Sequence, residues 1–212
     1  MLRGQSVEKE NNDSTAKVPI FNSFRVDIDI SAILTSFING GETFTYEAIV
    51  QTEIRNKYYP VFEIGYAGAK KTTSSGMSFD GNSLFYRLGM DFNIVKKKEQ
   101  KSTNNNFFLV GARIGYTNFD YSLNSAQISG NYWNESTVLP ELNKKSYNIW
   151  YEISAGIRVE MVKNIYLGWN VKIKNMITTV KPGEYKPWYV PGYGTYGDES
   201  VWGFNYLIGY KF

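Results

Sequence analysis

Charged side chains alternate with apolar ones in several segments of the sequence, and they are the residues best suited to chemistry. Asp27 and Asp29, for example, alternate with Val26 and Ile28 in FRVDIDIS. Because successive residues of a β-strand point to opposite faces, such a segment carries its charges on one face. The charged residues predicted to share that face, seven acidic and seven basic, are Arg25, Asp27, Asp29, Glu47, Glu63, Arg87, Asp91, Arg113, Glu152, Arg158, Glu160, Lys172, Lys174 and Lys211.

The equal number of acidic and basic residues favours ion pairing over conduction or catalysis. Charges gathered in a narrow interior must be paired to offset the cost of desolvation, so we predict a salt-bridged network. A proton- or ion-conducting path is the alternative, although a pore more naturally carries an excess of one sign. The carboxylates of Asp27 and Asp29 would lie about 6 to 7 Å apart, two strand steps along one face. That spacing could serve an enzyme, but neighbouring arginines favour neutralisation of both groups.

The composition argues against most classes of enzyme. The chain of 212 residues contains no His and no Cys, so it lacks the commonest general base, the commonest metal ligand and any thiolate. We therefore predict a protein that is not an enzyme and has no cofactor and no metal site; a lipid-modifying enzyme remains the alternative. The net charge of +3 is small, and we expect no nucleic acid partner.

Eight segments with strand-like alternation position these charges. The last one, VWGFNYLIGYKF, places Trp202, Phe204 and Tyr206 on one face and Gly203 and Asn205 on the other. No stretch approaches the roughly 18 consecutive apolar residues that a membrane helix needs. The predicted strands are residues 24–31, 43–54, 59–69, 84–94, 107–119, 147–161, 165–178 and 201–212.

The connections between these segments alternate in length. Those after the second and sixth strands are short and that after the fourth is moderate, whereas those after the first, third, fifth and seventh form the longer set as a whole, as in bacterial membrane barrels with short periplasmic turns. We predict an all-β protein, an eight-stranded antiparallel transmembrane up-and-down β-barrel over residues 21–212. Residues 1–20 are polar and predict a flexible periplasmic tail, without a secretory signal in the chain as given. A soluble eight-stranded barrel with an apolar interior is the alternative fold, disfavoured because the charged face is rich in glycine.

Aromatic residues are concentrated in the connection before the last strand, which contains KPWYVPGYGTYG. They could fold back on the rim of the barrel as an interfacial belt, bind a partner protein, or contact a glycan or lipopolysaccharide. The residues predicted to bind a partner are Trp188, Tyr189, Pro191, Tyr193 and Tyr196, with Tyr132 and Trp133 of the preceding long connection.

The order of several segments is similar to a family of small outer-membrane barrels found in Bacteroidota. The segments that carry this resemblance include FRVDIDIS, PVFEIGYA, FYRLGMDFN, EISAGIRVE and, most specifically, PWYVPGYG. The closing strand, which ends on an aromatic residue, resembles the terminal strand of bacterial outer-membrane barrels, and this resemblance implies an assembly signal at Tyr210 and Phe212.

The family resemblance implies a location in the bacterial outer membrane and brings no catalytic residues. It suggests an accessory, docking or structural subunit of a larger outer-membrane complex, such as barrel-assembly or nutrient-uptake machinery. The expected partners are outer-membrane lipids and other outer-membrane proteins or surface lipoproteins. A narrow pore or ion channel is the alternative function.

Overall fold

Eight long antiparallel strands close into a single ring. The computed structural model describes residues 21–32, 41–55, 57–74, 76–95, 106–124, 128–129, 136–137, 142–179, 186–197 and 200–212. The strands of the ring are β1 (Phe21–Asp29), β2 (Thr43–Ile54), β3 (Tyr58–Thr72), β4 (Ser78–Asn93), β5 (Phe107–Asn124), β8 (Leu142–Val162), β9 (Ile165–Met176) and β12 (Val201–Lys211). Each pairs with its neighbours along the chain, and β1 pairs with β12 to close the barrel. The predicted eight-stranded up-and-down barrel is confirmed.

In the part of the chain that the structure describes, four two-residue strands lie outside the ring. They are β6 (Ile128–Ser129), β7 (Ser136–Thr137), β10 (Tyr189–Val190) and β11 (Gly194–Thr195), which form two small hairpin-like sheets. Among the described residues, we find no helix whose length and apolar character would let it cross a membrane. The predicted tail, residues 1–20, and the predicted partner-binding residues Tyr132 and Trp133 lie outside the described residues.

The barrel carries its apolar side chains outside and its charges inside. Leu88 is 67% exposed on the outer surface, whereas the neighbouring Arg87 is 2% exposed within the barrel. The same alternation holds in β8, where Ile153 is 55% exposed and Glu152 is 0% exposed. This arrangement is the opposite of the soluble-barrel alternative, in which the apolar face would point inward.

Glycines on the inner face make room for large side chains in a narrow interior. A Cβ atom on Gly115 would lie 2.2 Å from the Trp150 ring, and one on Gly65 would lie 2.1 Å from the Phe85 ring. An eight-stranded barrel is only wide enough for side chains to fill it. Small residues therefore stand opposite the largest ones, which explains the glycine-rich inner face.

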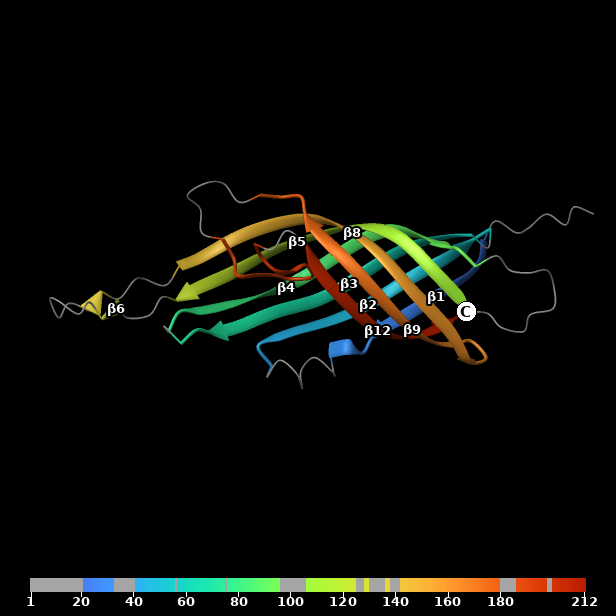
Figure 1. Ribbon diagram of the computed structural model, residues 1–212, viewed down its shortest axis with the longest axis horizontal. Helices are drawn as coiled ribbons and strands as arrows, with labels where there is room; N and C mark the ends of the chain where they lie inside the picture. Colours follow the sequence, from blue (N-terminus) through green and yellow to red (C-terminus); the bar gives the residue numbers. More distant parts are fainter. Residues whose placement is uncertain are drawn as a thin grey trace, which may run out of the picture.

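The wall of the barrel is much taller on one side than on the other. At the end opposite the C-terminus, β8 pairs with β9 only as far as Trp150↔Met176. Its pairing with β5 continues to Leu142↔Leu123, and Figure 1 shows β3, β4, β5 and β8 reaching beyond the other strands of the ring. We call this taller part, residues 69–72, 78–82, 118–124 and 142–149, the projecting wall. The end that carries it is the loop end, and the opposite end, where β2 leads into β3 and a tight turn at residues 163–164 joins β8 and β9, is the turn end.

The projecting wall corrects the predicted boundaries of four strands. The sequence predicts connections at residues 70–82 and 120–146. In the structure, β3 continues to Thr72 and β4 begins at Ser78, while β5 continues to Asn124 and β8 begins at Leu142. The outward residues there include Lys70, Asp80, Asp120 and Lys145. The outward face of these strands is therefore no longer apolar, although the strands continue. On the shorter side of the barrel, β1 ends at Asp29 and β9 at Met176, each two residues earlier than predicted.

Candidate functional site

The lumen at the turn end is closed by aromatic rings around a buried carboxylate. Tyr59, Phe107 and Tyr166 pack together there with Leu109. Glu53 accepts hydrogen bonds from the Ser23 hydroxyl at 2.9 Å, the Tyr59 hydroxyl at 3.0 Å and the Lys211 ammonium at 2.8 Å. The sequence prediction did not include Glu53, although it lies on the same strand face as Glu47.

Further into the barrel, Asp27 and Asp91 are each paired with arginines. Asp27 lies 2.9 Å from Arg25 Nε and 3.2 Å from Arg158 Nε. Asp91 accepts a hydrogen bond from Arg113 Nη2 at 2.9 Å. Both carboxylates are almost fully buried, so the pairing offsets their desolvation.

Glu63 lies at the centre of the largest ion-pair network. Its Oε2 is 2.8 Å from Arg87 Nη1 and 2.8 Å from Lys172 Nζ, and its Oε1 is 2.6 Å from Arg113 Nε. The side chain has no exposed surface. One carboxylate thus joins cations from three different strands, β4, β9 and β5.

Arg87 extends this network across the lumen. It is 2.8 Å from Glu47 Oε2 and 2.7 Å from Glu152 Oε1, in addition to Glu63. Glu152 also accepts a hydrogen bond from the Trp150 indole at 2.6 Å. The Arg87 guanidinium therefore contacts acidic groups on β2, β3 and β8 and ties these strands together.

A small apolar cluster lies among the charged groups of the interior. Ile49, Val61 and Leu207 pack together inside the barrel and are at most 2% exposed. Arg113 bonds to both Glu63 and Asp91, so the ion pairs form a continuous network beside this cluster.

The structure places almost all of the predicted charge set within the lumen. Glu160 differs, because it is only half-buried at the turn end, where its Oε1 accepts a hydrogen bond from the Asn164 amide at 3.1 Å. Uncharged polar groups that the prediction did not include, such as Gln51 and Ser154, bond to Asp91 and Arg113. These residues share the inward faces of β2 and β8, so the strand pattern would have found them.

The aromatic segment between β9 and β12 turns into the mouth of the barrel. We call residues 188–196 the plug. Tyr189 pairs with Thr195 and Val190 with Gly194 in the small sheet β10–β11, and Gly192 at the tip has φ of 80°. Val190 is 0% exposed.

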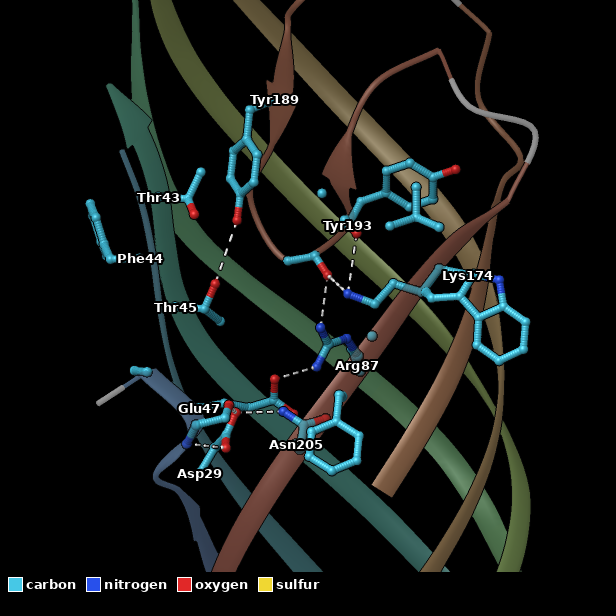
Figure 2. Close-up of a pocket in the computed structure, with 18 residues that line it drawn as sticks. Asp29, Thr43, Phe44, Thr45, Glu47, Arg87, Lys174, Tyr189, Tyr193 and Asn205 are labelled. Atoms are coloured by element: carbon cyan, nitrogen blue, oxygen red, sulfur yellow. Dashed lines mark hydrogen bonds and ion pairs between the residues drawn. The ribbon is translucent and has the colours of Figure 1, made fainter. Parts of the chain in front are cut away.

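Two lumen cations hold the tip of the plug through its backbone. The Gly192 carbonyl accepts hydrogen bonds from Arg87 Nη2 and Lys174 Nζ, both at 2.8 Å, and Lys174 Nζ also donates to the Tyr193 carbonyl at 3.2 Å. Figure 2 shows Tyr193 and Lys174 meeting in this way beside Arg87. The Tyr193 ring packs against Trp150 at 6.1 Å. The plug is thus an integral part of the lumen core.

The predicted partner-binding residues of this segment are divided by the plug. Tyr189, Pro191 and Tyr193 are buried, whereas Trp188 and Tyr196 are half-buried. The Trp188 ring lies 5.9 Å from Phe79 and 4.9 Å from Lys71 Nζ, on the inner side of the projecting wall. The rings therefore line the mouth of the lumen. That these residues bind a partner stays a prediction.

The predicted assembly signal lies on the outer surface at the turn end. The Phe212 ring stacks on Phe24 at 4.5 Å and meets Tyr210 edge-on at 4.7 Å. The Phe212 amide donates a hydrogen bond to the Phe24 carbonyl at 2.9 Å. These contacts extend the closure between β12 and β1 to the last residue, and the signalling role stays a prediction.

Two shallower features complete the set of candidate sites. The outer face of the projecting wall forms an open recess of about 420 Å³, lined by residues that include Asp80, Asp120 and Lys145. A cavity of about 180 Å³ lies beside the plug, lined by Asp29 and Lys174 among others. Within the described ranges, no group of three or more acidic side chains is arranged to hold a metal ion.

Comparison with known proteins places the chain in one family. No curated protein matches its sequence. Two crystal structures of Ail, the attachment invasion locus protein of Yersinia pestis, are similar at 9% identity, over 90% of this chain and 97% of that chain. The TM-score is 0.42 for Ail in complex with the heparin analogue sucrose octasulfate and 0.41 for Ail alone. The model of the family described as "Domain of unknown function (DUF6048)" matches residues 2–212, and the chain belongs to that family.

Proposed function

We propose that this protein is a barrel of the bacterial outer membrane that acts as a docking subunit and not as an enzyme or a pore. Its outer surface supports the membrane location. Exposed aliphatic and aromatic side chains surround the barrel, among them Ile28, Phe62, Leu88, Ile114 and Phe204. A band of this kind around a polar interior suits lipid and would aggregate in water.

The filled lumen supports docking over conduction. Glu63 forms ion pairs with both Arg87 and Lys172, and all three side chains are at most 2% exposed. The plug joins the same network, because the Gly192 carbonyl accepts a hydrogen bond from Arg87. Moving an ion through this interior would require breaking several buried ion pairs at once, and each one costs several kcal/mol to break.

The projecting wall is the single observation that carries the docking function. Beyond the last β8–β9 pair, β5 and β8 continue for eight residue pairs, which is roughly 27 Å of strand. Its outward residues are charged or polar, and the pairs Lys70–Asp80 and Lys145–Asp120 are largely exposed at 3.5 and 3.6 Å. The polar outer face ends where exposed Tyr66, Leu84 and Tyr147 begin. This change marks the edge of the lipid layer.

A tall, regular sheet held above the membrane offers a rigid surface to another protein. Rigid strands lose little conformational entropy on binding. The open recess around Asp120 and Lys145 provides a concave area into which a partner side chain can fit. Because the plug buries Tyr189, Pro191 and Tyr193, the docking surface is the projecting wall, with half-buried Trp188 and Tyr196 at its inner edge. The partner class is another outer-membrane protein or a surface lipoprotein.

Extraction of the tagged native protein in mild detergent tests this proposal. We expect it to co-purify with a partner at a fixed ratio, measured by particle size and mass spectrometry. A double change on the wall, Asp80→Lys with Asp120→Lys, should lower the bound fraction because it reverses two exposed charges of the proposed surface. The matched control is Lys163→Glu, an exposed charge at the turn end. A wild-type particle of monomer size, or equal losses in both variants, would contradict the docking role.

A further inference from the structure

Two charged side chains near the mouth of the lumen form no direct ion pair. The acidic groups Asp27, Glu47, Glu53, Glu63, Asp91 and Glu152 all form ion pairs with the arginines and lysines described above. Among the described residues of the lumen, Asp29 and Lys174 do not. Asp29 accepts hydrogen bonds from the Ser31 amide at 2.9 Å, the Tyr206 amide at 3.2 Å and the Asn205 side-chain amide, and Lys174 donates to two plug carbonyls. These two opposite charges line the same cavity, together with Glu47 and Arg87, which are paired with each other.

That cavity lies where β1 ends before its neighbours do. The pairing of β1 stops at Asp29↔Leu207 on one side and at Ile28↔Ala48 on the other. On the sides away from β1, the pairing of β12 with β9 continues to Val201↔Lys174, and the pairing of β2 with β3 continues to Thr43↔Ala69. In the described part of the wall, residues 43–47 and 201–205 therefore have no β1 partner between them.

Asp29 itself ends β1. Its Oδ1 accepts the amide of Ser31, two residues ahead, a local turn typical of aspartate, and it also accepts the Tyr206 amide of β12. The Ser31 hydroxyl donates to Oδ2 at 2.8 Å. The Ile30 amide still donates to the Tyr206 carbonyl at 2.8 Å, and the Asp29 carboxylate takes the place of the return bond from Tyr206. The ladder ends at this pair and leaves the gap above it.

The cavity lies in this gap in the wall of the barrel. Its lining includes Trp202 and Phe204, which point outward, together with Gly203 and Asn205, which point inward from the same strand. Because β1 leaves the facing edges of β2 and β12 unpaired here, we place the cavity between these two strands. Figure 2 shows Asp29 and Asn205 on one side of this space and Lys174 on the other. We call it the side slot; its volume is about 180 Å³.

We propose that the side slot binds the phosphoethanolamine head group of a membrane glycerophospholipid. Lys174 meets the phosphate and Asp29 meets the ammonium group, while the acyl chains lie outside along Trp202 and Phe204, which are 69% and 58% exposed. Two of the three N–H groups of the Lys174 ammonium are used by the plug, so one is free for a phosphate oxygen. The inference rests on the membrane location argued under the proposed function.

The lining favours a lipid over an added strand from another protein. An extended peptide could pair with the free edges of β2 and β12, but its neutral backbone would form no ion pair with Asp29 or Lys174. A head group with one charge of each sign compensates both. The opening also faces the apolar outer surface, which places acyl chains at its entrance.

Native mass spectrometry of the delipidated barrel in detergent tests the proposal with three lipids of equal chain length. Phosphatidylethanolamine should bind at one copy per barrel and at least about tenfold more tightly than phosphatidylglycerol, which has the phosphate but no amine. Diacylglycerol, with neither group, should bind most weakly. Lys174→Met should weaken both phospholipids, whereas Asp29→Asn should lower phosphatidylethanolamine to the level of phosphatidylglycerol and leave the latter unchanged.

Controls separate lipid binding from folding and from docking. Glu53→Gln and Lys211→Met remove a buried pair at the turn end and should leave the order of the three lipids unchanged. Gly203→Leu should abolish binding by filling the slot. A Cβ there lies 2.9 Å from the flexible end of Lys174 and in ordinary contact, at 3.6 Å, with the Lys172 Cβ, so the barrel can accept it. Equal binding of diacylglycerol, unchanged binding in Gly203→Leu, or equal losses of both phospholipids in Asp29→Asn would overturn the proposal. Co-purification with a protein partner would survive that failure, so the two proposals fail separately.

Discussion

Glu63 shows how strongly the lumen charges depend on one another. It has no exposed surface and lies within 2.8 Å of groups on Arg87, Arg113 and Lys172. Removing one member of a buried ion network leaves the others desolvated without compensation. The stability of the barrel therefore rests on single carboxylates to an unusual extent.

At this position we predict that Glu63→Gln destabilises the barrel by about 3–5 kcal/mol. The measurement is the urea midpoint of unfolding in detergent, followed by the loss of the compact, heat-sensitive form on gels. Asp120→Asn is the control, because its partner Lys145 is exposed and such pairs contribute less than about 1 kcal/mol. Equal midpoints for the two variants would show that the network contributes little.

Packing around the inner glycines gives a second prediction. Gly115→Ala places a Cβ atom 2.2 Å from the Trp150 ring, so the ring must move, and it supports Tyr193 of the plug. We expect a loss of about 1–3 kcal/mol, as for other overpacked cores, with a changed near-UV signal from Trp150. Gly203→Ala is the control, since its Cβ meets a flexible lysine end. Unchanged stability of Gly115→Ala would mean that the lumen is looser than described.

The plug is the element whose position decides what the mouth of the barrel can do. The chain has no Cys, so single cysteines report its packing without interference. Val190→Cys, at a position with 0% exposure, should react with a water-soluble maleimide at least about a hundredfold more slowly than Thr195→Cys, which is exposed, because reaction requires local opening. Adding Lys174→Met should speed the reaction at position 190, since it removes two hydrogen bonds to the plug. Equal rates at 190 and 195 would contradict a packed plug.

The sequence alone predicts most strands but not the height of the wall or the direction of the plug. Alternation located β2 at Thr43–Ile54, with the observed bounds, because both faces of that strand keep their character along its length. It failed above Tyr66 and Tyr147, where the outward face becomes polar while the inward face carries buried Phe79, Phe119 and Tyr121. The aromatic residues of the plug suit a rim, a partner or a lumen equally well. Only the pairing that sets Gly192 over Arg87 and Lys174 decides between them.

At the scale of the whole molecule, the two ends of the barrel should face different compartments. We predict that Lys145→Cys on the projecting wall is labelled on intact cells by a membrane-impermeant maleimide. Lys163→Cys, at the turn between β8 and β9, should be labelled only after the cells are opened, because the loop end faces outward in the proposed orientation. Both side chains are exposed, so the side of the membrane on which each lies, and not its burial, decides the outcome. The reverse pattern would invert the orientation and place the docking surface in the periplasm.

A sealed barrel is what separates the proposed docking subunit from the alternative, a narrow pore. The direct measurement is single-channel conductance of the purified barrel in planar bilayers, with a general porin as the positive control and gel migration as proof of folding. The structure predicts no stepwise current over the usual range of voltage, in wild type or when Lys174→Met loosens the plug, because Glu63, Arg87 and Lys172 still fill the cross-section below it. Reproducible steps of steady conductance in the folded wild type would contradict the sealed lumen and favour the narrow pore.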